Sequence, residues 1–288
     1  MCAVSLALFV AANALSVRRD LDQGVLPSRP GRPRASRFLQ SPIGLAFRLQ
    51  RAGMIGWAIG LFALGASYGS ILGELETFFG SNDMLGRMLD AAGGGSITEQ
   101  FIALLMTIIA LVATIPPVLT VNRLRGEEKR GRVEPLLGRA VSRARLLGGY
   151  VIIAALNGFV MIAASVTGLW AAGNASVENG LNFGKLLGDA MAYYPAVLVM
   201  VGLAAFLVGF FPRLTALNWL YLFYAYVVLY MGGMLQAPEW SKRLTPHGLV
   251  PSPADDAAWL PLAALCAAAV RLTAAGLAGY RRRDIASS

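Results

Sequence analysis

Six long apolar runs, each close to or above the length that crosses a lipid bilayer, constrain the fold of this chain more than any other feature. About 20 helical residues cross a hydrocarbon core roughly 30 Å thick. The runs are continuously apolar rather than alternating, so they indicate helices and not barrel strands. The sequence therefore predicts an all-α polytopic membrane protein with a six-helix transmembrane bundle, whose spans lie in residues 52–73, 100–122, 146–177, 190–212, 214–238 and 257–280.

The composition argues against several kinds of active site. Only 14% of the residues are charged, against roughly a quarter in soluble domains. Cys2 and Cys266 lie in apolar runs, and His247, the only histidine, lies in a predicted outer loop, so no disulfide framework or metal site is indicated. No acid lies deep within a span to form a proton relay, and "NGLNFGKLL" lacks the glycine and the Ser or Thr of a phosphate-binding loop. If the protein drives transport, its energy comes from another polypeptide.

The basic residues alternate between the loops on the two sides of the predicted bundle. Twenty of the 25 Lys and Arg residues fall on one side, four fall on the other, and Arg271 lies inside the last span. Loops rich in Lys and Arg remain in the cytoplasm. Both ends of the six-helix unit are therefore predicted to be cytoplasmic, and the net charge of +9 reports topology rather than nucleic-acid binding.

Residues 1–22 are interpreted as the last helix of a preceding, related half. Their exit, "AANALSVRRDL", is similar to the exit of the final span, "AAGLAGYRRRDI", which suggests an internal repeat. A chance match is the alternative. Residues 23–40, rich in Pro and Arg, form a predicted cytoplasmic linker, and residues 41–288 form the six-helix domain.

A short amphipathic helix is predicted at the inner membrane surface, just before the first complete span. In "SPIGLAFRLQRAG", apolar residues that include Phe47 oppose Arg48 and Arg51 at loose helical spacing. This pattern is typical of interfacial helices. The alternative is that the segment is the start of the span itself.

A charged segment, "RLRGEEKRGRVEPLLGRAVSRARLL", separates the second and third complete spans. Glu127 and Glu128 precede Arg132 at a spacing that supports a solvated helical turn. Gly131 then permits a bend. The eight basic residues of the segment explain its retention in the cytoplasm, but the embedded acids and the bend require another explanation.

The second part of this segment predicts a docking element. Glu134 and Pro135 begin a short helix, since proline is favoured at the first helical position, and this helix presents Leu136 and Leu137. Ser142 is the predicted N-cap of the next span. Two apolar anchors surrounded by charges suit the groove of a soluble partner. The alternative is a solvated loop that only determines topology.

These segments resemble one family. The charged segment continued to "GGY" is similar to the loop between the second and third helices of type-two ABC exporter permeases, in the group that exports polyketide antibiotics. "RRDLDQGVLPSRPGRPRASRFLQSPIGLAFRLQRAGMIGWAIG" resembles the central linker and second-half entry of that group. "LTPHGLVPSP" and "AGYRRRDI" resemble its last outer loop and its tail.

The resemblance implies a bacterial plasma-membrane permease of two six-helix halves, surrounded by lipid, that exports hydrophobic drugs or antibiotics. ATP and magnesium would bind to separate ATP-binding cassette subunits, and this chain would need no cofactor. Because members of the family are about twice as long as this chain, the other half would be a missing segment, another chain or a second copy. The implied interfacial elbow contains Phe47, Arg48 and Arg51, and the implied coupling residues are Glu127, Glu128, Gly131, Arg132, Glu134, Leu136, Leu137 and Arg143.

Several residues within the spans are candidates for a substrate pathway. Pro116 and Pro117 are expected to kink the second complete span, although a kink for packing is the alternative. The fifth span carries Asn218, Tyr224 and Tyr226 in a run of aromatic residues suited to large, flat, hydrophobic compounds. Interfacial anchoring is the alternative for the ends of that run.

Two glycine pairs at a spacing of four residues, Gly56 with Gly60 and Gly65 with Gly69, predict close helix contacts.

For the whole protein, two other functions remain open beside ATP-driven export. One is a non-transporting scaffold or regulatory subunit that recruits a soluble partner. The other is a passive or secondary carrier.

Overall fold

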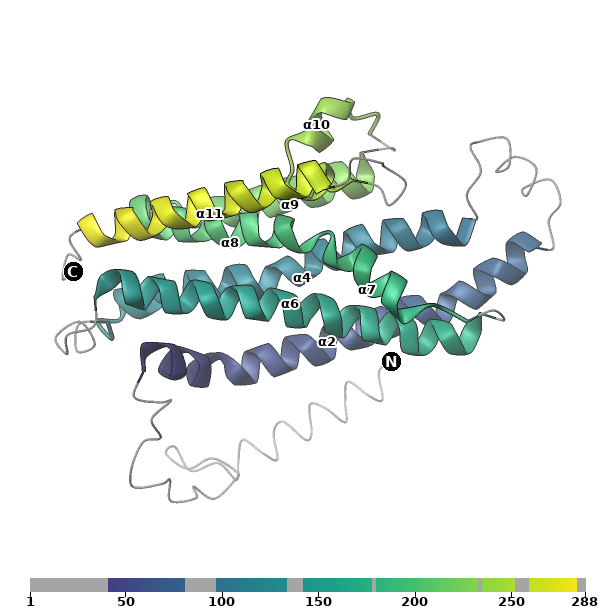
Figure 1. Cartoon of the computed structure of the whole chain (residues 1–288), viewed down its shortest axis with the longest axis horizontal. Helices are drawn as coiled ribbons and strands as arrows, with labels where there is room; N and C mark the ends of the chain where they lie inside the picture. The colour runs from purple at the N-terminus through teal and green to yellow at the C-terminus, as the bar shows by residue number, and fades with distance from the viewer. Residues whose placement is uncertain are drawn as a thin grey trace, which may run out of the picture. The chain divides into compact units, whose positions relative to one another are not determined.

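Residues 41–288 form one compact unit, of which a computed structural model describes residues 41–80, 97–133, 142–177, 180–232, 235–251 and 259–283. Within these ranges the regular structure is entirely helical (Figure 1), which confirms the all-α prediction. The predicted helix in residues 1–22, the linker in residues 23–40, and Glu134, Leu136 and Leu137 lie outside the described residues. The helices are α2 (Pro42–Gly80), α4 (Ile97–Lys129), α6 (Arg143–Ser176), α7 (Phe183–Met191), α8 (Tyr194–Phe210), α9 (Leu217–Met231), α10 (Glu239–Arg243), the 3₁₀ helix η1 (His247–Leu249) and α11 (Trp259–Arg282).

Five helical segments are long and apolar enough to cross a membrane, which confirms five of the six predicted spans. The remaining predicted span, the fifth (residues 214–238), contains among its described residues only α9, a helix of 15 residues. The chain leaves this helix at Gly232, where the amide of Ala237 donates to the Gly232 carbonyl at 2.8 Å. The five long segments are Ile43–Leu72, Phe101–Lys129, Arg143–Ser176, Phe183–Phe210 and Trp259–Arg282.

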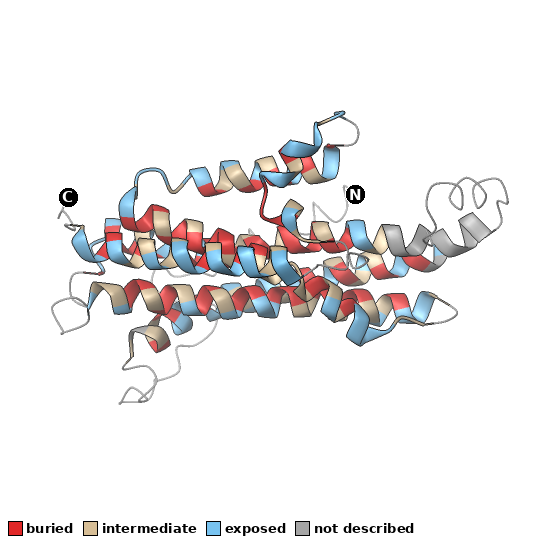
Figure 2. Ribbon diagram, turned by 45° about the horizontal axis from the view of Figure 1, so that its top comes forward, coloured by how far each residue is buried: buried red, intermediate tan, exposed pale blue. Residues whose placement is uncertain are grey.

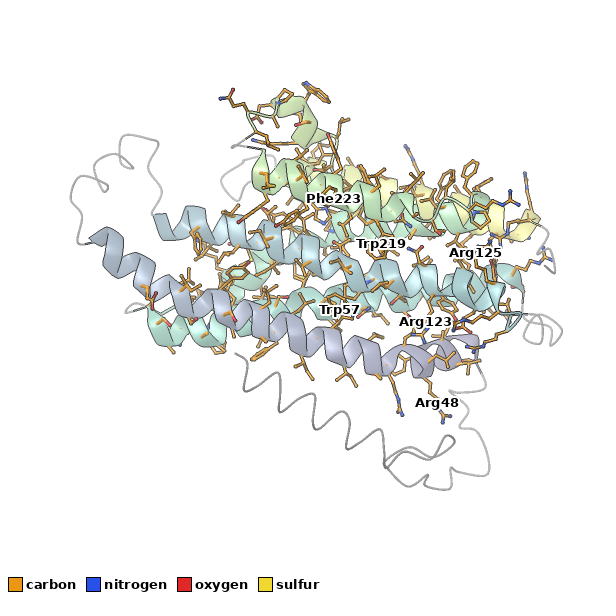
Figure 3. The ribbon with its side chains drawn as sticks, turned by 180° about the vertical axis from the view of Figure 1, so that it is seen from behind. Arg48, Trp57, Arg123, Arg125, Trp219 and Phe223 are labelled. Atoms are coloured by element: carbon orange, nitrogen blue, oxygen red, sulfur yellow. The ribbon has the colours of Figure 1, made fainter. Side chains whose placement is uncertain are left out.

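The predicted interfacial helix is not separate, because α2 runs without a break for 39 residues. Ser41 caps this helix by accepting a hydrogen bond from the amide of Gly44 at 3.0 Å, and Pro42 occupies its first position. Nothing between Ile43 and the span interrupts the helical hydrogen bonds, so the segment is the start of the span. Phe47, Arg48 and Arg51 are exposed, and Arg48 points away from the bundle (Figure 3).

Helices α2, α4, α6 and α8 alternate in direction, so α2 runs parallel to α6, and α11 runs parallel to α8 (Figure 1). Both parallel pairs approach closely through small residues. A Cβ atom added at Gly65 would overlap the backbone oxygen of Ser165 on α6, and one added at Gly69 would overlap that of Leu169. Small residues allow helix backbones to meet in this way. The prediction for this glycine pair is confirmed, whereas the Gly56 and Gly60 prediction is wrong for the described part of the chain, where a Cβ at either would meet nothing within 4 Å.

The pair α8 and α11 is built by the same principle. A Cβ atom added at Gly209 would overlap the carbonyl of Gly276, and one at Gly276 would overlap the backbone of Ala205. Helix α8 is buried or half-buried along nearly its whole length, whereas α11 buries one side and exposes the other (Figure 2). The two close pairs form a framework around which the functional side chains are placed.

The segment of α10 and η1 folds back against the bundle. Tyr221 and Tyr224 on α9 donate their hydroxyl protons to the carbonyls of Leu244 and Ser241, at 2.6 and 3.1 Å. His247 Nε2 lies 3.0 Å from Thr114 Oγ1, near the middle of the α4 span. The histidine lies in the connection between α9 and α11, as predicted, but its side chain is buried in the bundle and only 2% exposed. Burial lowers the pKa of His247, which is outside the spanning helices, to about 4.

Candidate functional site

Helix α4 ends at Gly131 in a Schellman motif. Gly131 has a φ of 67°, a left-handed conformation that glycine adopts without strain. Its amide donates to the Glu128 carbonyl at 2.9 Å, and the Arg132 amide donates to the Glu127 carbonyl at 3.1 Å. The predicted bend is therefore confirmed, and it directs the chain out of α4 into the segment before α6. The prediction that Ser142 is the N-cap of α6 is also confirmed, because its hydroxyl accepts a hydrogen bond from the Arg145 amide at 3.3 Å.

A group of charged side chains lies where α4 ends, α6 begins and α11 ends, and we call Arg125, Glu128, Arg143 and Arg283 the Arg283 cluster. Arg283 Nη2 contacts Glu128 Oε2 at 2.6 Å, and Arg125 Nη1 reaches the same oxygen at 3.4 Å. Arg283 Nη1 also donates to the Val208 carbonyl at 2.6 Å. Arg143 donates to the backbone carbonyl of Arg283. The cluster thus connects α4, α6, α8 and α11.

The burial of the Arg283 cluster makes its contacts strong. The Glu128 side chain is 2% exposed and that of Arg283 is 16% exposed. Hydrogen bonds between charged partners are roughly twice as strong as neutral ones, and a buried charge left without its partner is strongly unfavourable. The Arg283 guanidinium also lies 5.3 Å from the centre of the buried Tyr280 ring. These contacts therefore fix the end of α4 against α8 and the end of α11.

The predicted coupling residues divide between the interior and the surface. Glu127 and Glu128 are buried, so the predicted solvated turn is wrong: Glu128 faces Arg283, and Glu127 accepts from Arg132 Nη1 at 3.3 Å. The Arg132 side chain is 61% exposed, and Lys129 and Arg130 are exposed beside it. The end of α4 thus exposes its basic side chains, whereas its two acidic side chains are buried and form ion pairs within the protein.

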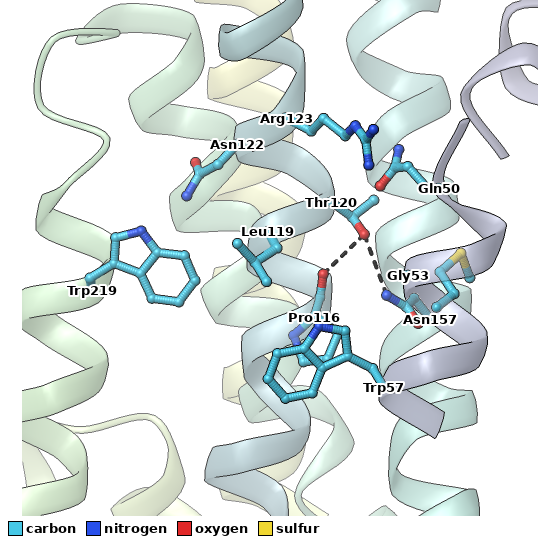
Figure 4. Close-up of a pocket in the computed structure, with 11 residues that line it drawn as sticks. Gln50, Gly53, Trp57, Pro116, Leu119, Thr120, Asn122, Arg123, Asn157 and Trp219 are labelled. Carbon is cyan, nitrogen blue, oxygen red and sulfur yellow. Dashed lines mark hydrogen bonds between the residues drawn. The ribbon is translucent and has the colours of Figure 1, made fainter. Parts of the chain in front are cut away.

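A cleft of about 400 Å³ opens between α2, α4, α6 and α9 (Figure 4). Its apolar walls include two tryptophans, Trp57 on α2 and Trp219 on α9, and its polar groups include Arg123, which lies between α4 and α2 (Figure 3). Clefts of several hundred Å³ with apolar walls and a few polar groups are typical binding sites for small molecules. The lining residues are Gln50, Gly53, Met54, Trp57, Pro116, Leu119, Thr120, Asn122, Arg123, Asn157 and Trp219.

A chain of hydrogen bonds fixes one polar wall of the cleft. The Thr120 hydroxyl donates to the Pro116 carbonyl at 3.0 Å, so it accepts the bond that Asn157 Nδ2 donates at 3.3 Å. This arrangement directs Asn157 Oδ1 elsewhere, and that atom has no partner. Gln50 Nε2 is likewise buried without a partner. A buried polar atom without a hydrogen bond costs about 1–3 kcal/mol.

The two predicted pathway prolines have different surroundings. Pro116 lines the cleft, whereas the Pro117 ring faces α6 at Gly158. Helix α4 continues through both residues. Because proline has no amide proton, the carbonyls of Val112 and Ala113 have no helical partner four residues on.

The structure places the other predicted pathway residues outside the cleft lining. Asn218 is fully buried, and its Nδ2 atom donates to Asn122 Oδ1 at 3.3 Å. Tyr224 binds α10, as described above. The rings of Tyr226 and Tyr230 stack at 5.4 Å on the exposed side of α9. Trp219, from the same aromatic run, is the one that lines the cleft.

Sequence reasoning missed most of the cleft. Gln50, Thr120 and Asn157 carry no ionisable group, so no intramembrane charge marks them, and Trp57 stands in an apolar run that is typical of any span. Amide side chains within or beside apolar runs, as at Gln50 and Asn157, are the signal that was present. The contacts of Arg283 had no such signal, because its partner Glu128 lies 155 residues away in the chain.

Comparisons with known proteins identify the family. Residues 39–281 match the family described as "Multidrug efflux system permease Rv1217c, C-terminal domain". The chain is 32% identical to the multidrug efflux system permease protein Rv1217c of Mycobacterium tuberculosis (strain ATCC 25618 / H37Rv), over 98% of this chain and 52% of the relative. The chain thus spans about half the length of that relative. It belongs to this family of ABC-type permease domains, and its five long apolar helices agree with a multi-pass membrane protein.

Proposed function

We propose that the chain is the membrane subunit of an ATP-driven exporter of hydrophobic drugs or antibiotics. Separate ATP-binding cassette subunits would bind ATP and magnesium and supply the energy. The name of the relative, a multidrug efflux permease, supports this substrate class. Because the chain spans about half of that relative, the working assembly would include another permease half or a second copy of this chain.

The Arg283 cluster is the observation that carries the coupling part of the proposal. It ties the end of α4 and the start of α6 to α8 and to the end of α11 through a buried ion pair and two bonds to backbone carbonyls. The exposed cations Lys129, Arg130 and Arg132 would orient an acidic surface of the ATP-binding subunit. A movement of that subunit would then displace the end of α4, and the cluster would transmit the displacement to two further helices.

The distribution of Lys and Arg supports the orientation. The basic loops, including the segment between α4 and α6, would lie in the cytoplasm with the carboxyl terminus. The ATP-binding subunits are expected on that side, where ATP is present. The protein would therefore lie in the bacterial plasma membrane with the Arg283 cluster near its inner surface.

Transport in inside-out membrane vesicles tests the proposal. The vesicles contain the chain with its ATP-binding subunits, and the measured quantity is ATP-dependent uptake of a hydrophobic fluorescent dye. We expect Arg132→Glu to reduce uptake about tenfold, because it breaks the contact with Glu127 and reverses a charge on the docking surface. Lys242→Glu, which changes an exposed cation on α10, is the matched control and should leave uptake unchanged.

Three outcomes contradict the proposal. Unchanged uptake in the Arg132→Glu vesicles would exclude the coupling surface. An absence of ATP-dependent uptake in the unaltered protein, with the soluble subunit still bound, would indicate a scaffold or regulatory subunit. Dye movement that proceeds without the ATP-binding subunits would indicate a passive or secondary carrier.

A further inference from the structure

We propose that the cleft between α2, α4, α6 and α9 binds an amphipathic anion. The flat apolar body of the ligand would lie against Trp57 and Trp219, and its acidic group would be held by Arg123 and Gln50. This assignment rests on the proposed function where it names the class of compound that the exporter carries. The binding itself can be measured separately.

The charge of the cleft favours an anion over a cation. Arg123 lines the cleft and forms no ion pair with the described residues, and no Asp or Glu stands among the residues that line it. The two acids further along α4 are occupied, since Glu127 pairs with Arg132 and Glu128 with Arg283. A cationic ligand would therefore meet an unopposed positive charge, and an acidic ligand would neutralise it.

Gln50 supplies a second donor for the same group. Its side chain is 5% exposed, and Nε2 has no partner. The Gln50 amide and the Arg123 guanidinium approach each other at one end of the cleft (Figure 4). Two oxygens of one carboxylate or sulfonate can accept from both groups. Binding of such an oxygen would relieve the desolvation cost of the Gln50 amide.

Asn157 adds a preference on the ligand body. The residue is 1% exposed. Its Nδ2 atom donates to the Thr120 hydroxyl, which leaves Oδ1 pointing away from Thr120 and without a hydrogen-bond partner. This oxygen accepts hydrogen bonds and cannot donate them. A hydroxyl or amide proton on the ligand, placed away from the acidic group, would satisfy it.

The apolar walls define the shape of the ligand. Trp57 on α2 and Trp219 on α9 both line the cleft, together with Met54 and Leu119. Aromatic side chains favour flat ring systems through stacking and burial of area, and the volume of about 400 Å³ fits a compound of drug size. Two sources share this chemistry: a transported aromatic acid and an acidic membrane lipid.

Equilibrium binding of two matched probes tests the proposal. Pyrenebutyric acid and pyrenebutanol share one ring system and differ in the acidic group. Their saturable quenching of tryptophan fluorescence is measured on the complete protein with its partner subunits, without nucleotide, in phosphatidylcholine nanodiscs. We expect the acid to bind about tenfold more tightly than the alcohol.

Substitutions locate this preference. Arg123→Gln should weaken binding of the acid about tenfold and leave binding of the alcohol nearly unchanged, whereas Arg123→Lys should keep most of the preference. Gln50→Leu should weaken acid binding less. Arg271→Gln, which changes an exposed arginine of α11 outside the cleft, is the matched control. Equal affinity for the two probes, or an unchanged preference in Arg123→Gln, overturns the proposal.

Two further arms identify the source of the anion. Phosphatidylglycerol in the nanodiscs that competes with the acid, in a manner lost in Arg123→Gln, identifies a membrane lipid as the occupant. ATP-dependent uptake of pyrenebutyric acid without that competition identifies a transported compound. If the binding preference holds and uptake fails, the site stands and the exporter proposal fails; if dye uptake succeeds and the preference is absent, only the site is refuted.

Discussion

Arg283 and Arg123 lie near the same end of the bundle, but their surroundings differ. Arg283 contacts a buried carboxylate and a backbone carbonyl, and its own carbonyl accepts from Arg143. Arg123 lines an open cleft beside an amide atom that has no partner. The difference indicates separate roles: the interactions of Arg283 are satisfied within the fold, whereas those of Arg123 are available to a ligand.

The comparison also separates stability from recognition. A side chain whose partners are all internal contributes to the free energy of unfolding, and its loss leaves those partners buried and unpaired. A side chain that faces a cleft contributes mainly when the ligand is present.

Replacing Arg283 by alanine should lower the free energy of unfolding by roughly 3–5 kcal/mol, because Glu128 would remain buried without its main counter-charge. Arg123→Ala should change it by less than about 0.5 kcal/mol. Denaturant unfolding in detergent, followed by tryptophan fluorescence, measures both values. Similar losses in the two variants would contradict the division between them.

Filling the close contact of α2 with α6 should have the next largest effect. We expect Gly65→Ala to cost roughly 1–3 kcal/mol, because the added Cβ would overlap the Ser165 backbone and force the helices apart. Gly60→Ala on the same helix is the control, since a Cβ there meets nothing within 4 Å. The control should be neutral or slightly stabilised. Equal destabilisation would show that α2 is not held at Gly65.

The His247 contact with Thr114 should make stability depend on pH. Burial lowers the pKa of His247 to about 4 from an ordinary value of 6.5, so between these values the unfolded chain binds more protons than the folded one. Stability is then fully present above about pH 6.5 and falls as the pH is lowered towards 4. Between pH 7.5 and 5.5 the expected loss is about 1 kcal/mol.

Unfolding midpoints measured at the two pH values test this expectation, and His247→Gln provides the reference without a titrating group. The part of the loss that belongs to His247 should disappear in that variant. An identical pH dependence in both proteins would mean that other groups cause it.

The sequence was sufficient to predict the features of the fold that depend on a single short segment. Five spans, the Ser142 cap and the Gly131 turn follow from local composition and local hydrogen bonds, and the structure confirms them. The close contact at Gly65 also followed from local spacing. Gly56 has the same spacing but faces no neighbour, because the spacing does not say which side of a helix meets another.

The candidate site was less predictable because it depends on contacts between distant segments. Glu127 and Glu128 stand in a charged loop sequence, which favoured exposure, yet Arg283 and the end of α4 bury them. His247 lies between prolines in a predicted outer loop, but its side chain is buried in the bundle and contacts Thr114. The cleft arises from polar residues on four helices, and no single segment carries its pattern.

The short length of α9 has a consequence for the surrounding lipid. Its 15 residues rise only about 22 Å, against a hydrocarbon core of roughly 30 Å, while α2, α4 and α6 are all longer. Hydrophobic mismatch of this kind costs fractions of a kcal/mol per Å and increases with bilayer thickness. Because α9 carries Trp219, acyl-chain length becomes a variable that acts on one wall of the cleft and leaves the long helices little affected.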